Sequence, residues 1–155
     1  MRPGRALVKN TRHSTERNEC MIPSSSRIPR YLFALLMVYG VASLIHFAHN
    51  AEFVADYPNL PVWLSRSKVY LAWFAVTAVG AVGMALLQLR FRVPGLVLIA
   101  GYAALGLAGL DHYWAAPFSA HSLAMNATIG FEVAAAAVLL ATVLLLLFRG
   151  QVGVG

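Results

Sequence analysis

The sequence predicts an all-α, polytopic membrane protein built as a bundle of four transmembrane helices. Of its 155 residues, 59% are hydrophobic and only 12% are charged, about half the charged fraction that is usual in soluble domains. The apolar residues gather in four long runs separated by short polar connections, and basic residues stand at the ends of these runs. This combination of composition, segment length and charge placement is typical of multi-pass membrane proteins.

The four runs have the length that a bilayer requires. A spanning helix needs about 20 mainly apolar residues, and three of the runs reach that length directly. The third run in the chain reaches it only if the helix continues through Asp111 and His112 to Trp114. We therefore expect helices at about residues 29–49, 68–89, 94–114 and 123–148.

These helices make up one transmembrane domain, residues 28–149, with a short tail on either side. Residues 1–27 mix charge, serine and proline without apolar periodicity, which predicts a flexible cytoplasmic tail. Met21 is an alternative start of translation, because MIPSSSRIPRYLF is a sufficient lead-in to the first apolar run. Residues 150–155 are expected to form a short C-terminal tail.

The basic residues also predict an orientation. They concentrate at the borders that share a side with the termini, where we count Arg27, Arg30, Arg90, Arg92 and Arg149. The opposite side carries only Arg66 and Lys68 among the residues after position 20. By the positive-inside rule we expect a bacterial inner-membrane protein whose N and C termini are both cytoplasmic. An aromatic belt is expected at the outer interface, made of Tyr57, Trp63, Tyr70, Tyr113, Trp114 and Phe118.

The partners follow from the same pattern. A net charge of +6 often indicates nucleic-acid binding, but here the basic residues form small clusters beside apolar runs, where they suit lipid headgroups. We therefore expect the lipid bilayer, and no nucleic acid, as the main partner. Small residues at a four-residue spacing predict close helix packing, either within the bundle or against other membrane subunits or a second copy. They are Ala81 and Ala85, Ala104 and Ala108, and Ala137 and Ala141.

The stretch HFAHNAEFVADYP, residues 46–58, is the first place where the sequence indicates chemistry. It sets His46, His49, Glu52 and Asp56 at the end of an apolar run. If the helix continues this far, residues three apart share a broad face, so the two imidazoles and the Glu52 carboxylate could meet one ligand. The single cysteine, Cys20, forms no CxxC pattern and leaves the redox compartment open.

The expected topology brings further ionisable residues to the same side. Asp111 and His112 end the third helix, and His121 precedes the fourth. Glu132 lies about seven residues into the fourth helix, roughly 10 Å along it, and is flanked by apolar residues. Because a charge in lipid is costly, Glu132 should face the bundle interior, where it is either paired with a histidine or Asn126 or carried in the protonated form.

These residue types allow three roles. Imidazoles and carboxylates bind transition metal ions, although the second helix offers no His, Asp or Glu, which disfavours a symmetric di-metal centre and leaves a mononuclear site from the other three helices. The same groups can relay protons. They can also be ordinary interfacial polar residues, with Glu132 as a helix-anchoring hydrogen-bond partner.

Residues 40–92 resemble the first two helices of DoxX-like small four-helix membrane proteins. The resemblance rests on an HF pair ending the first helix, a later aromatic residue, a Pro followed by an LP element, glycines in the second helix and arginines after it. Here these are His46 and Phe47, Phe53, Pro58, Leu60 and Pro61, Gly80 and Gly83, and Arg90 and Arg92. The glutamate that such proteins commonly carry early in the second helix is replaced by the run containing Trp73, Phe74 and Thr77. The resemblance implies the four-helix architecture, and some members are linked to quinone-coupled oxidation or membrane redox complexes.

Three functional hypotheses follow. The first is a redox- or metal-associated membrane protein whose outer-face cluster binds a transition metal ion or relays protons near a quinone. The second is an accessory or assembly subunit with no chemistry of its own. The third is a small proton-coupled carrier in which Glu132 is the titrating group. The sequence assigns no catalytic residue and does not decide whether the protein is an enzyme.

Overall fold

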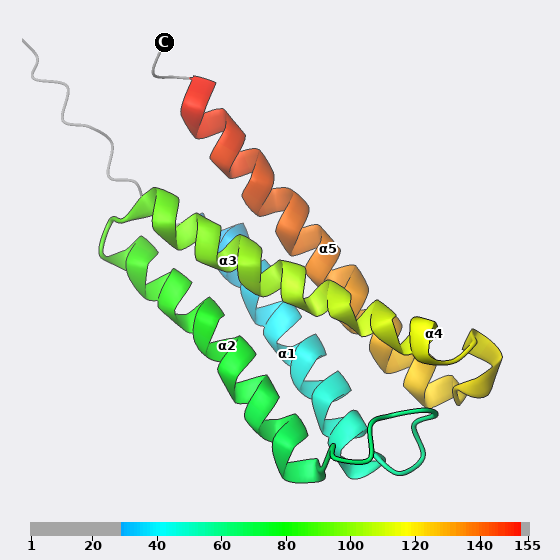
Figure 1. The fold of residues 1–155 in the computed structure, drawn as a ribbon. Helices are drawn as coiled ribbons and strands as arrows, with labels where there is room; N and C mark the ends of the chain where they lie inside the picture. The colour runs from blue at the N-terminus through cyan, green and yellow to red at the C-terminus, as the bar shows by residue number, and fades with distance from the viewer. Residues whose placement is uncertain (1–28, 153–155) are drawn as a thin grey trace, which may run out of the picture.

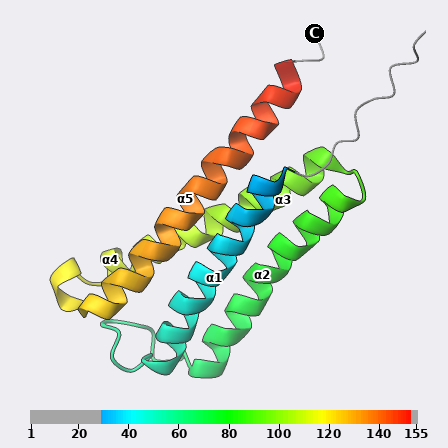
Figure 2. The same cartoon turned by 180° about the vertical axis from the view of Figure 1, so that it is seen from behind.

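The computed structural model describes residues 29–152 as an antiparallel bundle of four long helical segments (Figures 1 and 2). The elements are α1 (Arg30–Glu52), α2 (Arg66–Gln88), α3 (Arg92–Gly106), the 3-10 turn η1 (Leu107–Leu110), α4 (Asp111–Ala115), the 3-10 turn η2 (Phe118–Ala120) and α5 (Leu123–Val152). The all-α prediction is confirmed for the described residues. The predicted tail 1–27 and the alternative start Met21 lie outside them.

Four segments are long and apolar enough to cross a membrane: Arg30–Glu52, Arg66–Gln88, Arg92–Ala115 and Leu123–Arg149. They match the four predicted helices, and two details differ. The last helix continues through Val152, so residues 150–152 extend α5 instead of belonging to a C-terminal tail. The third segment continues through α4, as a membrane-spanning length requires. Between α3 and α4 its helix tightens into 3-10 geometry over Leu107–Leu110.

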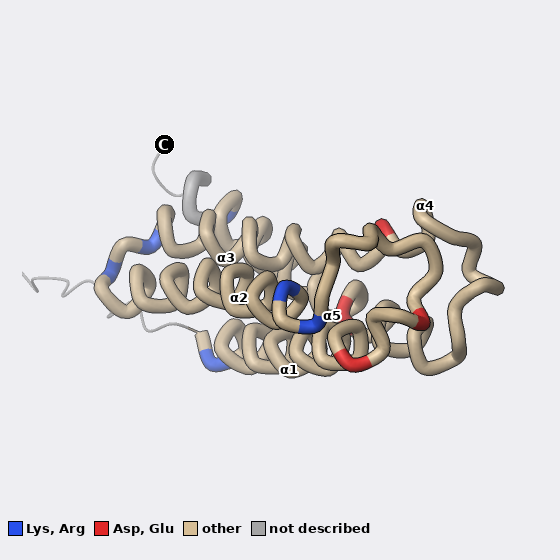
Figure 3. Tube along the Cα trace, turned by 60° about the horizontal axis from the view of Figure 1, so that its bottom comes forward, with Lys and Arg blue, Asp and Glu red and all other residues tan. Residues whose placement is uncertain are grey.

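Two ends of the bundle can be defined from the connections. The loop end carries residues 53–65, between α1 and α2, and residues 116–122, between α4 and α5. The terminus end carries the starts of α1 and α3, the end of α2 and the last turns of α5 (Figure 1). Among the described residues, the carboxylates all lie toward the loop end, whereas basic residues occur at both ends (Figure 3).

The turn from α2 to α3 shows how the chain reverses at the terminus end. Arg90 has φ 68°, the left-handed conformation that a helix C-terminal cap requires. The Arg90 amide donates to the Leu87 carbonyl over 3.1 Å, and the Phe91 amide donates to the Leu86 carbonyl over 2.8 Å. This is the Schellman pattern with arginine in the place usually taken by glycine, and it ends α2 sharply enough for α3 to pack back along it.

Glycines set the closest helix contacts. A Cβ on Gly95 of α3 would lie 2.9 Å from the Gly83 carbonyl oxygen of α2. Gly80 faces the Tyr102 ring, and Gly106 faces the Tyr39 ring, each at a distance where a Cβ would collide. The two tyrosine rings pack at 4.5 Å, and the Tyr39 hydroxyl donates to the Tyr102 carbonyl over 3.1 Å. Helix approach in the bundle therefore depends on Gly–Gly and Gly–Tyr contacts.

The alanine pairs do not form close helix contacts within the bundle, so that part of the prediction is wrong. The six alanines of the Ala81–Ala85, Ala104–Ala108 and Ala137–Ala141 pairs are all exposed on the bundle surface. The spacing alone could not distinguish an inward from an outward face, because in lipid both faces are apolar. The small residues buried between the helices include Gly80, Gly83, Gly95 and Gly106, together with Ala42, Ala103 and Ala136.

We predict that Gly95→Ala destabilises the bundle and that Gly101→Ala does not. The added methyl at position 95 meets the α2 backbone, which cannot move aside as a side chain can, and should lower the free energy of unfolding by about 1–3 kcal/mol. A Cβ at Gly101 meets no atom within 4 Å, so its substitution should be neutral or stabilising by up to about 1 kcal/mol. Reversible unfolding in detergent micelles, followed by circular dichroism, measures both. Equal effects at the two positions would contradict the proposed Gly83–Gly95 contact.

Candidate functional site

A cluster of polar side chains fills the interior of the bundle toward the loop end. We call it the histidine cluster, and it consists of His46, His49, Tyr57, His112, His121 and Glu132. Helix α1 supplies two of the histidines, α4 and the residue after η2 supply one each, the 53–65 connection supplies the tyrosine, and α5 supplies the glutamate. Two regions that are distant in sequence, residues 46–57 and 112–132, therefore contribute to one site.

The deepest contact joins His46 and Glu132. The His46 Nε2 atom lies 3.6 Å from the Glu132 Oε2 atom, and the two side chains are only 4% and 2% exposed. The distance suits an ion pair and is slightly longer than a hydrogen bond, so a small rotation of either side chain would close one. Since an isolated charge is costly in such surroundings, this pair is stable as two neutral groups or as two opposite charges. Transfer of one proton interconverts the two forms.

The backbone around Glu132 leaves room for its carboxylate. Gly109 lies in the 3-10 turn that faces α5, and a Cβ on it would lie 3.6 Å from the Glu132 Oε2 atom and 3.2 Å from a methyl group of Val133. A methyl group at position 109 would therefore make an ordinary contact with the carboxylate and a tight one with Val133. The third segment thus passes close to α5 where the carboxylate is buried.

From His46 the cluster continues through aromatic ring contacts. The His46 and His112 rings have centroids 5.4 Å apart at an interplanar angle of 79°. The His112 ring then contacts two further rings, Tyr57 at 5.1 Å and His121 at 6.1 Å. The rings thus form a continuous row that starts at Glu132 and branches at His112.

One branch ends at His49. The His49 Nδ1 atom lies 3.0 Å from the Tyr57 hydroxyl. Tyr57 lies in the 53–65 connection and is only 4% exposed, and this burial raises the pKa of its phenol above the ordinary value of 10.0. The hydroxyl therefore keeps its proton. Which group donates in its hydrogen bond with His49 Nδ1 depends on the tautomer of the His49 ring.

The other branch ends at His121, whose tautomer can be assigned. The His121 Nδ1 atom lies 3.1 Å from the Pro117 carbonyl oxygen, and because a carbonyl only accepts, Nδ1 must carry a proton. In the neutral ring the Nε2 atom is then an acceptor. That atom is buried and has no hydrogen-bond partner among the described residues, and the same is true of His46 Nδ1 and Glu132 Oε1.

Asn126 fixes the loops that close the site. Its amide nitrogen donates to the carbonyls of Phe118 and His121, each over 3.2 Å, and its oxygen accepts from the Tyr113 hydroxyl over 3.0 Å. We expected Asn126 or a histidine as the partner of Glu132. The structure gives Glu132 a histidine and assigns Asn126 to holding the 116–122 connection and α4 against α5.

Three predicted residues lie outside the cluster. Glu52 accepts from Arg66 Nη2 over 2.6 Å and from the Tyr70 hydroxyl over 2.8 Å, so it ties the end of α1 to the start of α2 at an exposed position. Asp56 and Asp111 are exposed. The i, i+3 spacing had placed Glu52 on the same helix face as His49. It could not reveal that Arg66 of α2 would pair with Glu52.

Tyr57, Gly109 and Ser43 belong to the site and were not predicted there. Tyr57 was expected in the aromatic belt, but the structure buries it against the histidines. Ser43 is fully buried three residues before His46, a spacing that places both on one helix face and could have identified it. Nothing in the sequence marks Gly109, because its role depends on the position of α5.

The donor arrangement bears on the metal hypothesis. Within the part of the chain that the structure describes, no group of three or more His, Cys, Asp or Glu side chains is placed to hold a metal ion. The His46 and His112 rings meet edge to face, and so do the His112 and His121 rings. Each neutral imidazole in the row between the carboxylate and the bundle end can accept a proton on one nitrogen and release one from the other.

Comparison with known proteins adds no family assignment. No family model matches the sequence, and no curated protein or solved structure matches it either. The resemblance of residues 40–92 to DoxX-like proteins stays a prediction.

Proposed function

We propose that this protein is a proton-relaying membrane protein in which the histidine cluster connects the outer aqueous face with Glu132 in the bundle interior. The observation that carries the proposal is the buried contact between His46 Nε2 and Glu132 Oε2, continued by the ring of His112 toward the loop end. A buried carboxylate beside a row of imidazoles is a group that can be loaded with a proton and unloaded again.

The proposal places the four segments across a bacterial inner membrane with both termini in the cytoplasm. The support is their length and hydropathy, together with the basic residues at the terminus end. In this orientation the loop end and its carboxylates face outward. Protons would then enter the histidine cluster from the outer side.

Buried hydroxyl groups continue the polar interior of the bundle from Glu132 toward the terminus end. Ser43 and Tyr39 precede His46 by three and seven residues, so they lie on the same face of α1 at successively deeper positions. Both are fully buried. The Tyr39 hydroxyl donates to the Tyr102 carbonyl, and the Tyr102 hydroxyl faces Gly40 nearer the terminus end. These hydroxyls supply groups through which a proton on Glu132 could be passed inward, so the proposal favours proton coupling over simple anchoring of helices.

The orientation predicts the labelling of introduced cysteines. In a Cys20→Ser background, Val62→Cys and Ser119→Cys should react with a membrane-impermeant maleimide added to intact cells, whereas Phe91→Cys should react only after permeabilisation. All three positions are exposed, so each should label fully in detergent. Reaction of positions 62 and 119 from opposite sides would refute the shared face and with it the proposal.

The relay predicts proton uptake that depends on Glu132. The full chain, reconstituted in phosphatidylcholine vesicles with a trapped pH-sensitive dye, should acidify the lumen after an external acid pulse faster than empty vesicles do. Glu132→Gln keeps the side-chain volume but removes the titrating group, and should slow this uptake at least about tenfold. Glu52→Gln is the matched control, because Glu52 is the exposed carboxylate held by Arg66 outside the cluster, and it should retain the wild-type rate.

Two results would contradict the relay. One is a wild-type rate no higher than that of empty vesicles. The other is an equal loss in the Glu132→Gln and Glu52→Gln proteins.

A further inference from the structure

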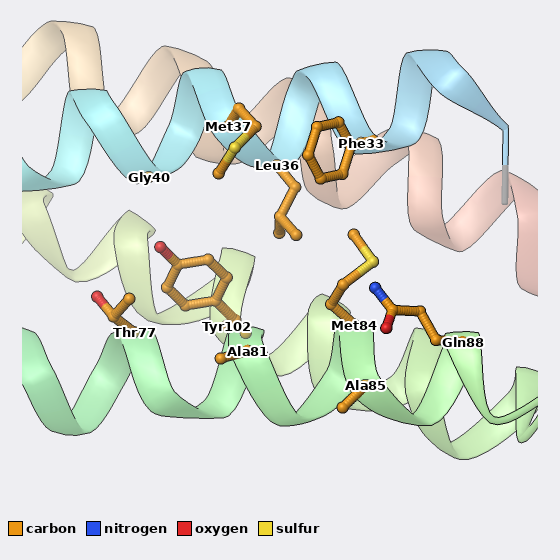
Figure 4. Close-up of a pocket in the computed structure, with 11 residues that line it drawn as sticks. Phe33, Leu36, Met37, Gly40, Thr77, Ala81, Met84, Ala85, Gln88 and Tyr102 are labelled. Atoms are coloured by element: carbon orange, nitrogen blue, oxygen red, sulfur yellow. The ribbon is translucent and has the colours of Figure 1, made fainter.

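A second feature lies away from the histidine cluster, in the half of the bundle near the terminus end. A groove of about 330 Å³ runs between α1 and α2, and Tyr102 of α3 contributes to its lining (Figure 4). On α1 it extends from Phe33 to Gly40, and on α2 from Thr77 to Gln88. Its walls are mainly apolar, and Met37 and Met84 project into it from opposite sides (Figure 4).

The groove has a polar mouth at the terminus end. A neighbouring hollow of about 470 Å³ is lined by Arg30, Phe33, Met84 and Gln88, and the last three of these also line the groove. Arg30 is exposed, and within residues 29–149 it forms no ion pair. The two hollows therefore adjoin, with a guanidinium and an amide at the terminus end and mainly apolar walls beyond them.

We propose that this groove binds one anionic phospholipid, with an acyl chain along α1 and α2 and the phosphate-bearing headgroup at Arg30 and Gln88. The argument is charge complementarity at the mouth combined with apolar walls behind it. Among residues 29–149, no carboxylate lines either hollow, so a negative headgroup meets one cation there and no repulsion from these residues. Flexible methionine side chains suit an acyl chain, because they adapt to an irregular apolar ligand.

The size of the groove favours a lipid chain over a partner helix as its occupant. Between Phe33 and Gly40, α1 rises roughly 10 Å, and a helix about 10 Å across running along that length would need more than twice 330 Å³. Such a helix could lie over the groove but not inside it. A single acyl chain is thin enough to enter, and the bilayer supplies it directly from the side.

The test uses native mass spectrometry of the full chain in detergent, titrated separately with phosphatidylglycerol and phosphatidylcholine of the same acyl composition. We expect one phosphatidylglycerol to bind in preference to phosphatidylcholine. Arg30→Gln should reduce the phosphatidylglycerol affinity roughly fivefold, the contribution of one basic side chain at a membrane surface. Arg92→Gln is the matched control, since it removes the same charge from the same end of the bundle without lining the groove.

A second pair of variants tests the acyl-chain half of the proposal. Ala81 is exposed and lines the groove, so Ala81→Phe should fill it and lower lipid binding at least about tenfold. Ala78 is exposed on the same helix and lines no part of the groove, so Ala78→Phe should bind lipid like the wild type. Thermal unfolding of both variants shows that each is folded before binding is compared.

Three results would overturn the proposal. Lipid binding that survives Ala81→Phe would place the lipid elsewhere. Equal affinity for the two lipids, unchanged in Arg30→Gln, would remove the headgroup site. A dimer that excludes lipid and dissociates in Ala81→Phe would make a second copy of the chain the occupant.

Discussion

The buried contact between His46 and Glu132 is the constraint on which the arrangement of this bundle depends. A carboxylate that is 1% exposed inside an apolar bundle must meet a partner, and the partner stands on a different helix. This requirement fixes the register of α1 against α5. The third segment passes close to this carboxylate at Gly109, where an added Cβ would lie 3.6 Å from the Glu132 Oε2 atom. His112, which lies on the same third segment as Gly109, contacts His46. The position of Glu132 therefore determines where the other polar groups gather.

The two ends of the bundle consequently have different chemistry. Toward the loop end, polar side chains fill the interior and the backbone is irregular, with two 3-10 turns and the short helix α4. Toward the terminus end, the core is apolar, the tightest contacts are made by glycines, and the polar groups lie at the surface. A proton-handling site and a lipid-binding groove would thus occupy separate halves of one small bundle. The tyrosine pair Tyr39 and Tyr102 lies between them.

The sequence predicted the features that depend on local composition. The four helices, their approximate bounds and the inward placement of Glu132 follow from apolar length and from the cost of a charge in lipid. It also predicted that His46, His112 and His121 would share one end with Glu132. It did not predict partners across the bundle, because these depend on helix rotation: Glu52 meets α2 instead of the histidines, and Tyr57 turns inward instead of toward the interface. The orientation of the alanine pairs was not predictable for the same reason, since the helix faces toward lipid and toward the bundle interior are both apolar.

A double-mutant cycle between His46 and Glu132 tests the central claim most directly. The free energy of unfolding in detergent micelles would be measured for the wild type, His46→Phe, Glu132→Leu and the double variant. Each single variant leaves a buried polar group without its partner, whereas the double variant removes both, so the account predicts a coupling of about 1–3 kcal/mol and a double variant at least as stable as either single one. Additive effects, with the double variant the least stable of the four, would contradict it.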